Sequence, residues 1–188
     1  AMHEALFPNS YHFTDAGWYL GDNKWRAHYY DHEKDELIPE EKGVIEVRNQ
    51  VARIISEHPK VACVLSSHEH SYNRTLIDAS TPAGIPGVDD KNGDGIITWP
   101  DEPASPIPGY KHPVWYITSA GAGAPYYGKV DLPWNTYWEK KDPSKFVYTS
   151  QENIVIFTSS NGKLSLKAVN SSGHIIEEIP DLLSVKKN

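Results

Sequence analysis

The most constraining feature of the chain is a short apolar run that ends abruptly in two histidines. Residues 61–65 read Val-Ala-Cys-Val-Leu, the length of a buried strand, and two serines then lead into His68-Glu69-His70. Side chains that follow a strand in this way lie at the carboxyl edge of an α/β sheet, where ligands bind. Two neutral imidazoles at such an edge indicate metal ligation. Solvated loop histidines are the alternative, because a chain with nine histidines contains such a pair easily by chance.

A helix is predicted directly before this strand. Pro39 and the two glutamates after it suit a first helical turn, and one helical face is predicted to carry the apolar residues Val44, Val47, Val51, Ile54 and Ile55. His58 and the proline after it end the helix. The alternation of helix and strand predicts an α/β fold with a layered sheet. Residues 9–37 show no periodicity and are interpreted as a long ordered loop.

The last third of the chain is predicted to be an antiparallel meander that forms core. Its short strands are expected over 146–149, 153–159, 163–169 and 174–179. Asn161-Gly162 lies between the second and third strands and is a strong type I′ hairpin signal. Along these two strands the apolar residues alternate as in a half-buried pair, a pattern that predicts Ile154, Ile156, Leu164, Leu166 and Ala168 on the buried side.

The histidine segment also carries a family resemblance. Strand, His68-Glu69-His70 and then Tyr72 and Arg74 resemble the Gly-His-x-His block of calcineurin-like metallophosphoesterases, especially of the purple-acid-phosphatase branch. Ser67 stands where that family usually has Gly, which narrows the allowed backbone angles. The segments 1–8 and 113–125 resemble an earlier strand end with one histidine and the next core strand with its small-residue loop.

The resemblance implies a fold, a metal centre and a reaction. The fold would be α/β, a layered β-sandwich flanked by helices, with residues 1–188 as the C-terminal portion of one metallophosphoesterase domain. His3 and His68 would bind one divalent transition metal and His70 a second, from Zn, Mn or Fe. A metal-activated hydroxide would then hydrolyse a phosphate ester, whether monoester, diester or nucleotide. Arg74 would either contact substrate oxygens as a catalytic residue or tie the loop to neighbouring carbonyls.

Three blocks of that family are not found in this sequence. They are Asp-x-His, Gly-Asp-x-x-Asp and Gly-Asn-His, which in the family lie upstream of the segment that contains His3. Two dications about 3.5–4 Å apart act jointly on a phosphoryl group, and they repel each other unless an anion bridges them. We therefore expect this polypeptide alone to be inactive, with three histidines that hold one Zn²⁺ or Ni²⁺ loosely. We also expect an exposed sheet edge that favours a dimer or a domain swap.

A calcium-loop pattern lies in the proline-flanked stretch 78–112, which is interpreted as an insertion. Residues 90–101 place oxygen ligands at positions one, three, five, seven and twelve, with Gly95 at six and an apolar residue at eight. These ligands would be Asp90, Asn92, Asp94, the Ile96 carbonyl and Asp101. Position twelve is usually Glu, and the alternative is an acidic surface turn. A structural Ca²⁺ here favours a secreted or periplasmic protein, where calcium is millimolar.

Composition excludes some classes of function. The formal net charge of −7 argues against a protein that binds the nucleic acid backbone, because such proteins concentrate Lys and Arg. No segment approaches the roughly 18 apolar residues of a membrane span. Two hypotheses remain open, a phosphoesterase that acts on phosphate esters and a non-catalytic secreted calcium-binding module. A transition metal bound through His68 and His70 would support the first, and calcium alone would support the second.

Overall fold

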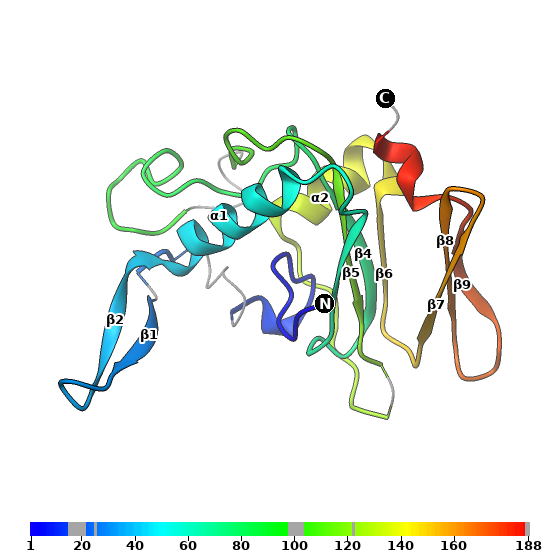
Figure 1. The fold of residues 1–188 in the computed structure, drawn as a ribbon, viewed down its shortest axis with the longest axis horizontal. Helices are drawn as coiled ribbons and strands as arrows, with labels where there is room; N and C mark the ends of the chain where they lie inside the picture. The colour runs from blue at the N-terminus through cyan, green and yellow to red at the C-terminus, as the bar shows by residue number, and fades with distance from the viewer. Residues whose placement is uncertain (15–21, 25, 98–103, 122, 187–188) are drawn as a thin grey trace.

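The computed structural model describes residues 1–14, 22–24, 26–97, 104–121 and 123–186, and this part of the chain is mixed α/β (Figure 1). It contains two α-helices, and its strands form three separate sheets. The α/β class predicted from the sequence is therefore confirmed. No helix among the described residues is both long enough and apolar enough to cross a membrane.

A central four-stranded sheet carries the histidine segment. Its strands are β3 (Cys63–Ser66), β4 (Tyr72–Ile77), β5 (Val114–Ser119) and β6 (Phe146–Thr149). They lie in the order β3-β5-β4-β6, with β3 parallel to β5 and β4 antiparallel to both of its neighbours. The apolar run before the histidines is thus a strand, as predicted. Because β3 and β5 are parallel and Ser66 pairs with Thr118, the loops after both strands leave the sheet at the same edge.

The predicted helix exists, but its predicted start is wrong. Helix α1 covers Val44–Ser56, and the residues before it form a hairpin of β1 (Arg26–Asp31) with β2 (Glu36–Gly43) that projects from the body of the molecule (Figure 1). Pro39 lies in β2, where the extended backbone suits its fixed φ and it pairs with His28. The prediction of a loop over 9–37 is wrong for its second half. Cross-strand pairs such as Tyr30 with Leu37 form a β-hairpin there.

A distant asparagine anchors the start of α1. Asn23 Oδ1 accepts a hydrogen bond from Glu46 N at 3.2 Å, which is the contact an N-cap side chain makes, and Asn23 Nδ2 donates to Glu46 Oε2 at 2.9 Å. Gly43 N donates to the same carboxylate at 3.1 Å. The hydrogen bond from Asn23 is the main cause that lowers the pKa of Glu46, with a smaller contribution from Gly43. Asn23 also donates its backbone N–H to Gly95 O at 3.0 Å, so the helix start and the calcium-loop segment share one anchor.

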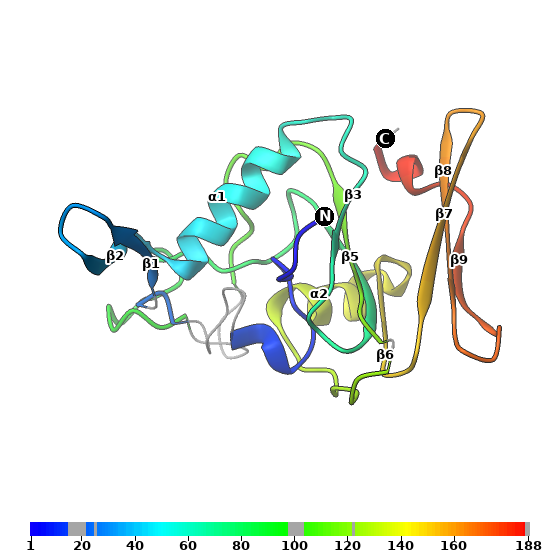
Figure 2. The same ribbon diagram turned by 60° about the horizontal axis from the view of Figure 1, so that its bottom comes forward.

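One face of the central sheet packs against α1 (Figure 2). Ile45 and Ala52 of the helix join Ile77, Val114 and Tyr116 of the sheet in one buried cluster. Arg48, on the same helix, is buried with its guanidinium 5.2 Å from the ring centroids of both Phe7 and Trp134. Burial disfavours its charge and lowers the pKa of Arg48 to about 9.

The C-terminal meander forms as predicted. Strands β7 (Ile154–Ser160), β8 (Lys163–Val169) and β9 (Ile175–Ile179) make an antiparallel sheet in that order. Asn161 and Gly162 have φ values of 50° and 69°, which confirms the type I′ turn.

The predicted buried face of this meander is only half right. Leu166 and Ala168 are fully buried, but Ile154 and Ile156 are exposed. The register explains the difference, because Leu166 pairs with Phe157 and directly opposed residues share a face. The residues of β7 that face the core are therefore those next to the predicted ones.

The second face of the central sheet packs against this meander. A single cluster contains Leu76 and Trp115 from the central sheet together with Leu166 and Ala168 from β8. Helix α2 (Pro133–Lys141) contributes Trp138 to the same cluster. The structure is therefore layered, with α1, the central sheet and the meander in succession (Figures 1 and 2).

Strand β3 lies at one edge of the central sheet. Beside it, Met2 N donates to Leu65 O at 2.9 Å and Ser67 N donates to His3 O at 3.1 Å. The N-terminal residues thus run along the last part of this edge. Association of two copies through it stays a prediction.

The packing of the two sheets yields a stability prediction. Leu166→Ala removes a fully buried side chain from the inter-sheet cluster, and we expect a loss of about 2–5 kcal/mol in the free energy of unfolding. Ile156→Ala on the opposite face of the meander is the matched control, with an expected loss below about 1 kcal/mol. Urea unfolding of both variants measures the difference. Equal losses would contradict the inter-sheet packing.

Candidate metal centre

The loop after β3 takes a backbone conformation that concentrates its side chains at the sheet edge. His68 has a φ of 63°, in the left-handed region that non-glycine residues seldom adopt. Such conformations cluster at functional sites, where the surrounding structure maintains them. Ser67, at the position where the resembled family has Gly, is not in this region, so its side chain is compatible with the loop.

Three imidazoles meet at this edge. His3 Nε2 lies 2.8 Å from His68 Nδ1, and the second ring nitrogen of His68, Nε2, lies 3.1 Å from His12 Nδ1. The structure thus brings together His3 and His68, which are 65 residues apart in the sequence. It also adds His12, from the 3₁₀ helix η1 (Tyr11–Thr14), which sequence reasoning took for part of an ordinary loop. Nothing in the local sequence distinguishes His12 from other loop histidines.

One carboxylate approaches the same pair of rings. Glu4 Oε1 lies 3.7 Å from His3 Nε2 and 3.6 Å from His68 Nδ1, so these three residues form a group that is close enough to hold a metal ion. The other carboxylate oxygen, Glu4 Oε2, is buried and has no hydrogen-bond partner among the described residues. Sequence reasoning missed Glu4, although its place directly after His3 was a usable signal.

His70 lies beside this group and has a fixed hydrogen bond of its own. Its Nδ1 is 2.8 Å from Pro125 O, and a carbonyl only accepts, so Nδ1 carries the proton and the Nε2 lone pair stays available in the neutral ring. The ring stacks on Tyr127 at 4.7 Å and lies 6.5 Å from the His12 ring. A metal-binding histidine commonly donates its other N–H to a carbonyl in this way. Its predicted role as a ligand of a second metal stays a prediction.

The carboxylate of Glu69 fixes the segment that leads to His12. It is buried and accepts from the backbone N–H groups of Asn9 and Ser10, from the Ser10 hydroxyl at 2.7 Å and from Asn73 Nδ2 at 3.2 Å. Burial raises the pKa of Glu69, and these donors oppose that shift by stabilising the charged form. The residue between the two histidines of the motif therefore holds the neighbouring loop in place.

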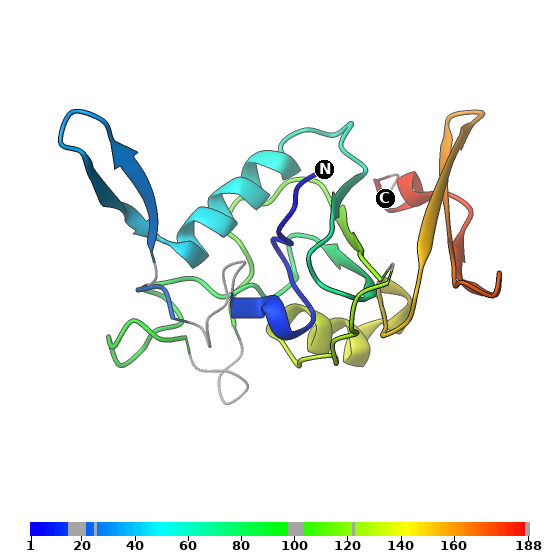
Figure 3. The same cartoon turned by 90° about the horizontal axis from the view of Figure 1, so that it is seen from below.

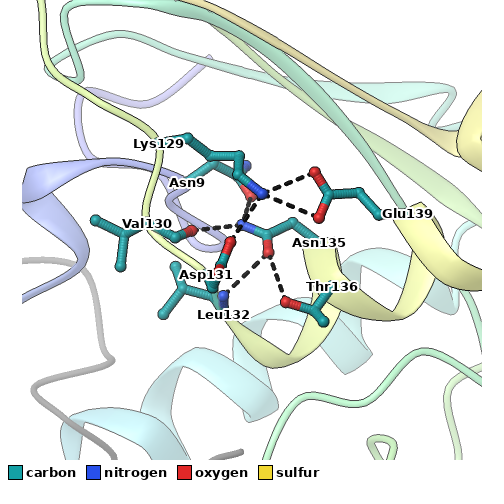
Figure 4. Close-up of polar contacts among 8 residues, drawn as sticks. All are labelled: Asn9, Lys129, Val130, Asp131, Leu132, Asn135, Thr136 and Glu139. Atoms are coloured by element: carbon teal, nitrogen blue, oxygen red, sulfur yellow. Dashed lines mark hydrogen bonds and ion pairs between the residues drawn. The ribbon is translucent and has the colours of Figure 1, made fainter.

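Asn9 extends this connection to helix α2. Asn135 Nδ2 donates to Asn9 Oδ1 at 3.0 Å and to Val130 O at 2.8 Å, while Asn135 Oδ1 accepts from Leu132 N at the start of the helix (Figure 4). Asn9 Nδ2 in turn donates to Asn73 and Thr75 on β4. Val130 N, just before α2, also donates to Asn9 O at 3.0 Å, and Figure 3 shows the N-terminal segment and α2 from below. The loop that bears His12 is thus anchored to three elements.

Arg74 makes its contacts on the inter-sheet side of β4, and a contact with substrate stays a prediction. Arg74 Nε donates to Glu177 Oε2 at 2.9 Å, Nη2 donates to Ser144 O at 3.1 Å, and the guanidinium lies 4.2 Å from the Trp115 ring centroid. These partners belong to the inter-sheet face, because neighbouring residues of β4 alternate in direction and Asn73 faces Glu69 instead. Arg74 ties the two sheets together and does not face the imidazoles.

The calcium-loop segment has a compact turn structure. Asp90 accepts from Gly93 N at 2.9 Å and from Gly95 N at 2.8 Å, and both glycines have positive φ values of 74° and 86°. Asp94 accepts from Ile96 N at 2.8 Å. Ile97, the apolar residue at position eight, is buried in the cluster beneath α1, which anchors the loop.

The other two predicted side-chain ligands of calcium are Asn92 and Asp101. Asn92 is exposed and its Nδ2 donates to Asp94 Oδ2 at 2.9 Å. Asp101 lies outside the described residues. The described part of 78–112 contains no helix or named strand, and its interpretation as an insertion stays a prediction.

Comparison with protein-family models, with characterised proteins and with solved structures gives no match.

The Glu69 network yields the second prediction. Glu69→Gln places an amide NH₂ against two backbone donors, and we expect it to cost about 1–3 kcal/mol in the free energy of unfolding and to displace His12 from His68. Urea unfolding measures the first effect, and histidine ring NMR shifts measure the second. Glu139→Gln, which alters an exposed contact with Lys129, should change stability by less than about 0.5 kcal/mol. Unchanged stability and unchanged His12 shifts in Glu69→Gln would refute the network's role.

Proposed function

We propose that the chain contributes the histidine side of a metal centre in a metal-dependent phosphoesterase of the calcineurin-like class, with a layered sandwich fold of that kind. The observation that carries the proposal is the pair His3 Nε2 and His68 Nδ1, 2.8 Å apart at the carboxyl edge of β3. The order of the elements supports it, because a strand, a His-x-His loop and two further core strands follow one another as in the resembled family.

The donor set fits a transition metal. Imidazole nitrogens suit Zn²⁺ and similar borderline ions. A tetrahedral Zn²⁺ with bonds near 2.05 Å separates two nitrogens by about 3.3 Å, so these two rings need to open by about half an ångström. That is a small movement for His3, whose side chain is 68% exposed.

The residues around the pair can orient and hold a phosphate ester. A bound divalent metal would polarise a phosphoryl oxygen and lower the pKa of water. His12 Nδ1, at 3.1 Å from His68 Nε2, adds a further imidazole to the site. Tyr127 packs on both His70 and His12 and forms an aromatic wall of the site.

The proposal assigns no independent activity to these 188 residues. The sequence contains none of the three blocks that supply the bridging carboxylate and the remaining ligands of the resembled centre. A two-metal reaction needs those groups. The phosphoesterase activity therefore depends on groups beyond the ones found here.

The third prediction tests the metal centre. Zn²⁺ titration by calorimetry should show binding that His68→Asn weakens at least about tenfold, whereas His28→Asn, an exposed histidine on the projecting hairpin, leaves it unchanged. Hydrolysis of p-nitrophenyl phosphate by the chain with Zn²⁺ or Mn²⁺ should not exceed the metal blank. Unchanged Zn²⁺ affinity in His68→Asn would contradict the metal centre. Hydrolysis well above the metal blank would contradict the expected inactivity.

A second candidate function is calcium binding by the inserted loop. The specific observation is that Asp90 closes a turn over two glycines of positive φ while Ile97 fixes the loop to the core. This arrangement suits a loop whose first, third and fifth side chains supply oxygen ligands. We propose that Ca²⁺ there is structural and that the protein is exported to a calcium-rich compartment.

The fourth prediction concerns this loop. Calorimetry should detect Ca²⁺ binding with a Kd of about 10⁻⁴–10⁻³ M, and Asp94→Asn should weaken it at least about tenfold because a charged ligand is lost. Asp131→Asn, at an exposed carboxylate near α2, is the matched control and should bind Ca²⁺ as the wild type does. Absence of saturable binding up to about 10 mM Ca²⁺ would contradict the site. Ca²⁺ binding without any His68-dependent metal would favour the non-catalytic module.

A further inference from the structure

We infer that Glu4 is the third protein ligand of a mononuclear transition-metal site that it forms with His3 and His68. The inference rests on the metal centre of the proposed function, but it does not depend on ester hydrolysis. It gives this chain a complete set of three ligands from two segments, the N-terminal residues and the loop after β3.

The spacing of the three donor atoms matches the size of a metal ion. His3 Nε2, His68 Nδ1 and Glu4 Oε1 form a triangle with edges of 2.8, 3.6 and 3.7 Å. A triangle with these edges has a circumradius of about 2.0 Å, which is the distance at which Zn²⁺ binds imidazole nitrogen and carboxylate oxygen. A single position therefore lies about 2.0 Å from all three atoms, and the two rings would open by about half an ångström for tetrahedral bonds.

One oxygen of the Glu4 carboxylate has no hydrogen-bond donor in its buried surroundings within the described part of the chain. Oε2 is buried and has no hydrogen-bond partner among the described residues, although the side chain as a whole is 43% exposed. A buried carboxylate oxygen without a donor is costly. A cation between the carboxylate and the two rings removes this cost, because it neutralises the negative charge.

The ring nitrogens that point away from this position have partners of their own. His3 Nδ1 lies 3.2 Å from Ser67 Oγ, and His68 Nε2 lies 3.1 Å from His12 Nδ1. When the second nitrogen of each ring donates to such a partner, the nitrogen at the proposed site keeps its lone pair for the metal. Ser67, the departure from the resembled family, thus acquires a role in orienting His3.

Two imidazoles and one carboxylate form a donor set that binds Zn²⁺, Co²⁺ or Fe²⁺ and leaves coordination positions open. The exposure of His3 places those positions near solvent. An acid–base contact without metal is the competing arrangement, in which a protonated imidazole pairs with Glu4. The two arrangements differ in their response to added metal.

The test is Zn²⁺ titration of the full chain by competition calorimetry, with Co²⁺ visible absorption as a second readout. Glu4→Gln should weaken Zn²⁺ binding at least about tenfold and alter the Co²⁺ spectrum. Glu57→Gln is the matched control, because Glu57 is an exposed carboxylate of 42% exposure on the end of α1, and it should bind as the wild type does. Circular dichroism of each variant confirms folding.

The outcomes separate this inference from the proposed function. Loss of affinity in both Glu4→Gln and His68→Asn supports the three-ligand site. Wild-type affinity in Glu4→Gln, together with loss in His68→Asn, overturns the role of Glu4 and leaves the histidine centre intact. A wild-type chain that binds neither Zn²⁺ nor Co²⁺ overturns both.

Discussion

The buried carboxylate of Glu69 is the interaction on which the candidate site depends. Glu69 lies between His68 and His70 in the sequence, and its carboxylate accepts hydrogen bonds from Asn9 and Ser10 in the N-terminal segment. Burying a carboxylate is costly unless donors surround it, and folding supplies backbone donors here. The carboxylate therefore constrains the loop at Asn9 and Ser10, because a movement of that loop would remove donors from a buried charge.

Successive side chains of β4 point to opposite faces of the sheet and have different partners. Asn73 and Thr75 face the loops at the site, and both hold Asn9. Arg74 points to the opposite face and joins the sheets through Glu177. An arginine close in sequence to a histidine pair therefore does not by itself define an active-site arginine. The face of the strand decides the role.

Local signals in the sequence predicted much of the fold. The strand before His68, the existence of helix α1 and the Asn161-Gly162 turn depend on residues close in sequence, and all three are present. The predicted apolar face of α1 is wrong, because Val47 and Ile54 are exposed while Ile45 and Ala52 are buried. Long-range contacts were harder to predict. The hairpin of β1 and β2 needs cross-strand pairing, and His12 reaches His68 only because Glu69 and Asn135 fix its loop. The pair His3 and His68 could be predicted, because the resemblance implies that these two histidines bind one metal and so lie close together.

The two segments that carry the proposed metal ligands are not held equally. The loop after β3, which carries His68, is fixed by the hydrogen bonds of Glu69, whereas two backbone hydrogen bonds to Leu65 and Ser67 hold the residues at His3. A ligand that binds only the folded state stabilises it by about 2.7 kcal/mol at a hundred times its Kd. A metal bound by His3, Glu4 and His68 would add this stabilisation where the N-terminal residues, the more weakly held of the two segments, contact the loop after β3. The metal would then complete the edge of the sheet as well as the site, because the same residues run along β3.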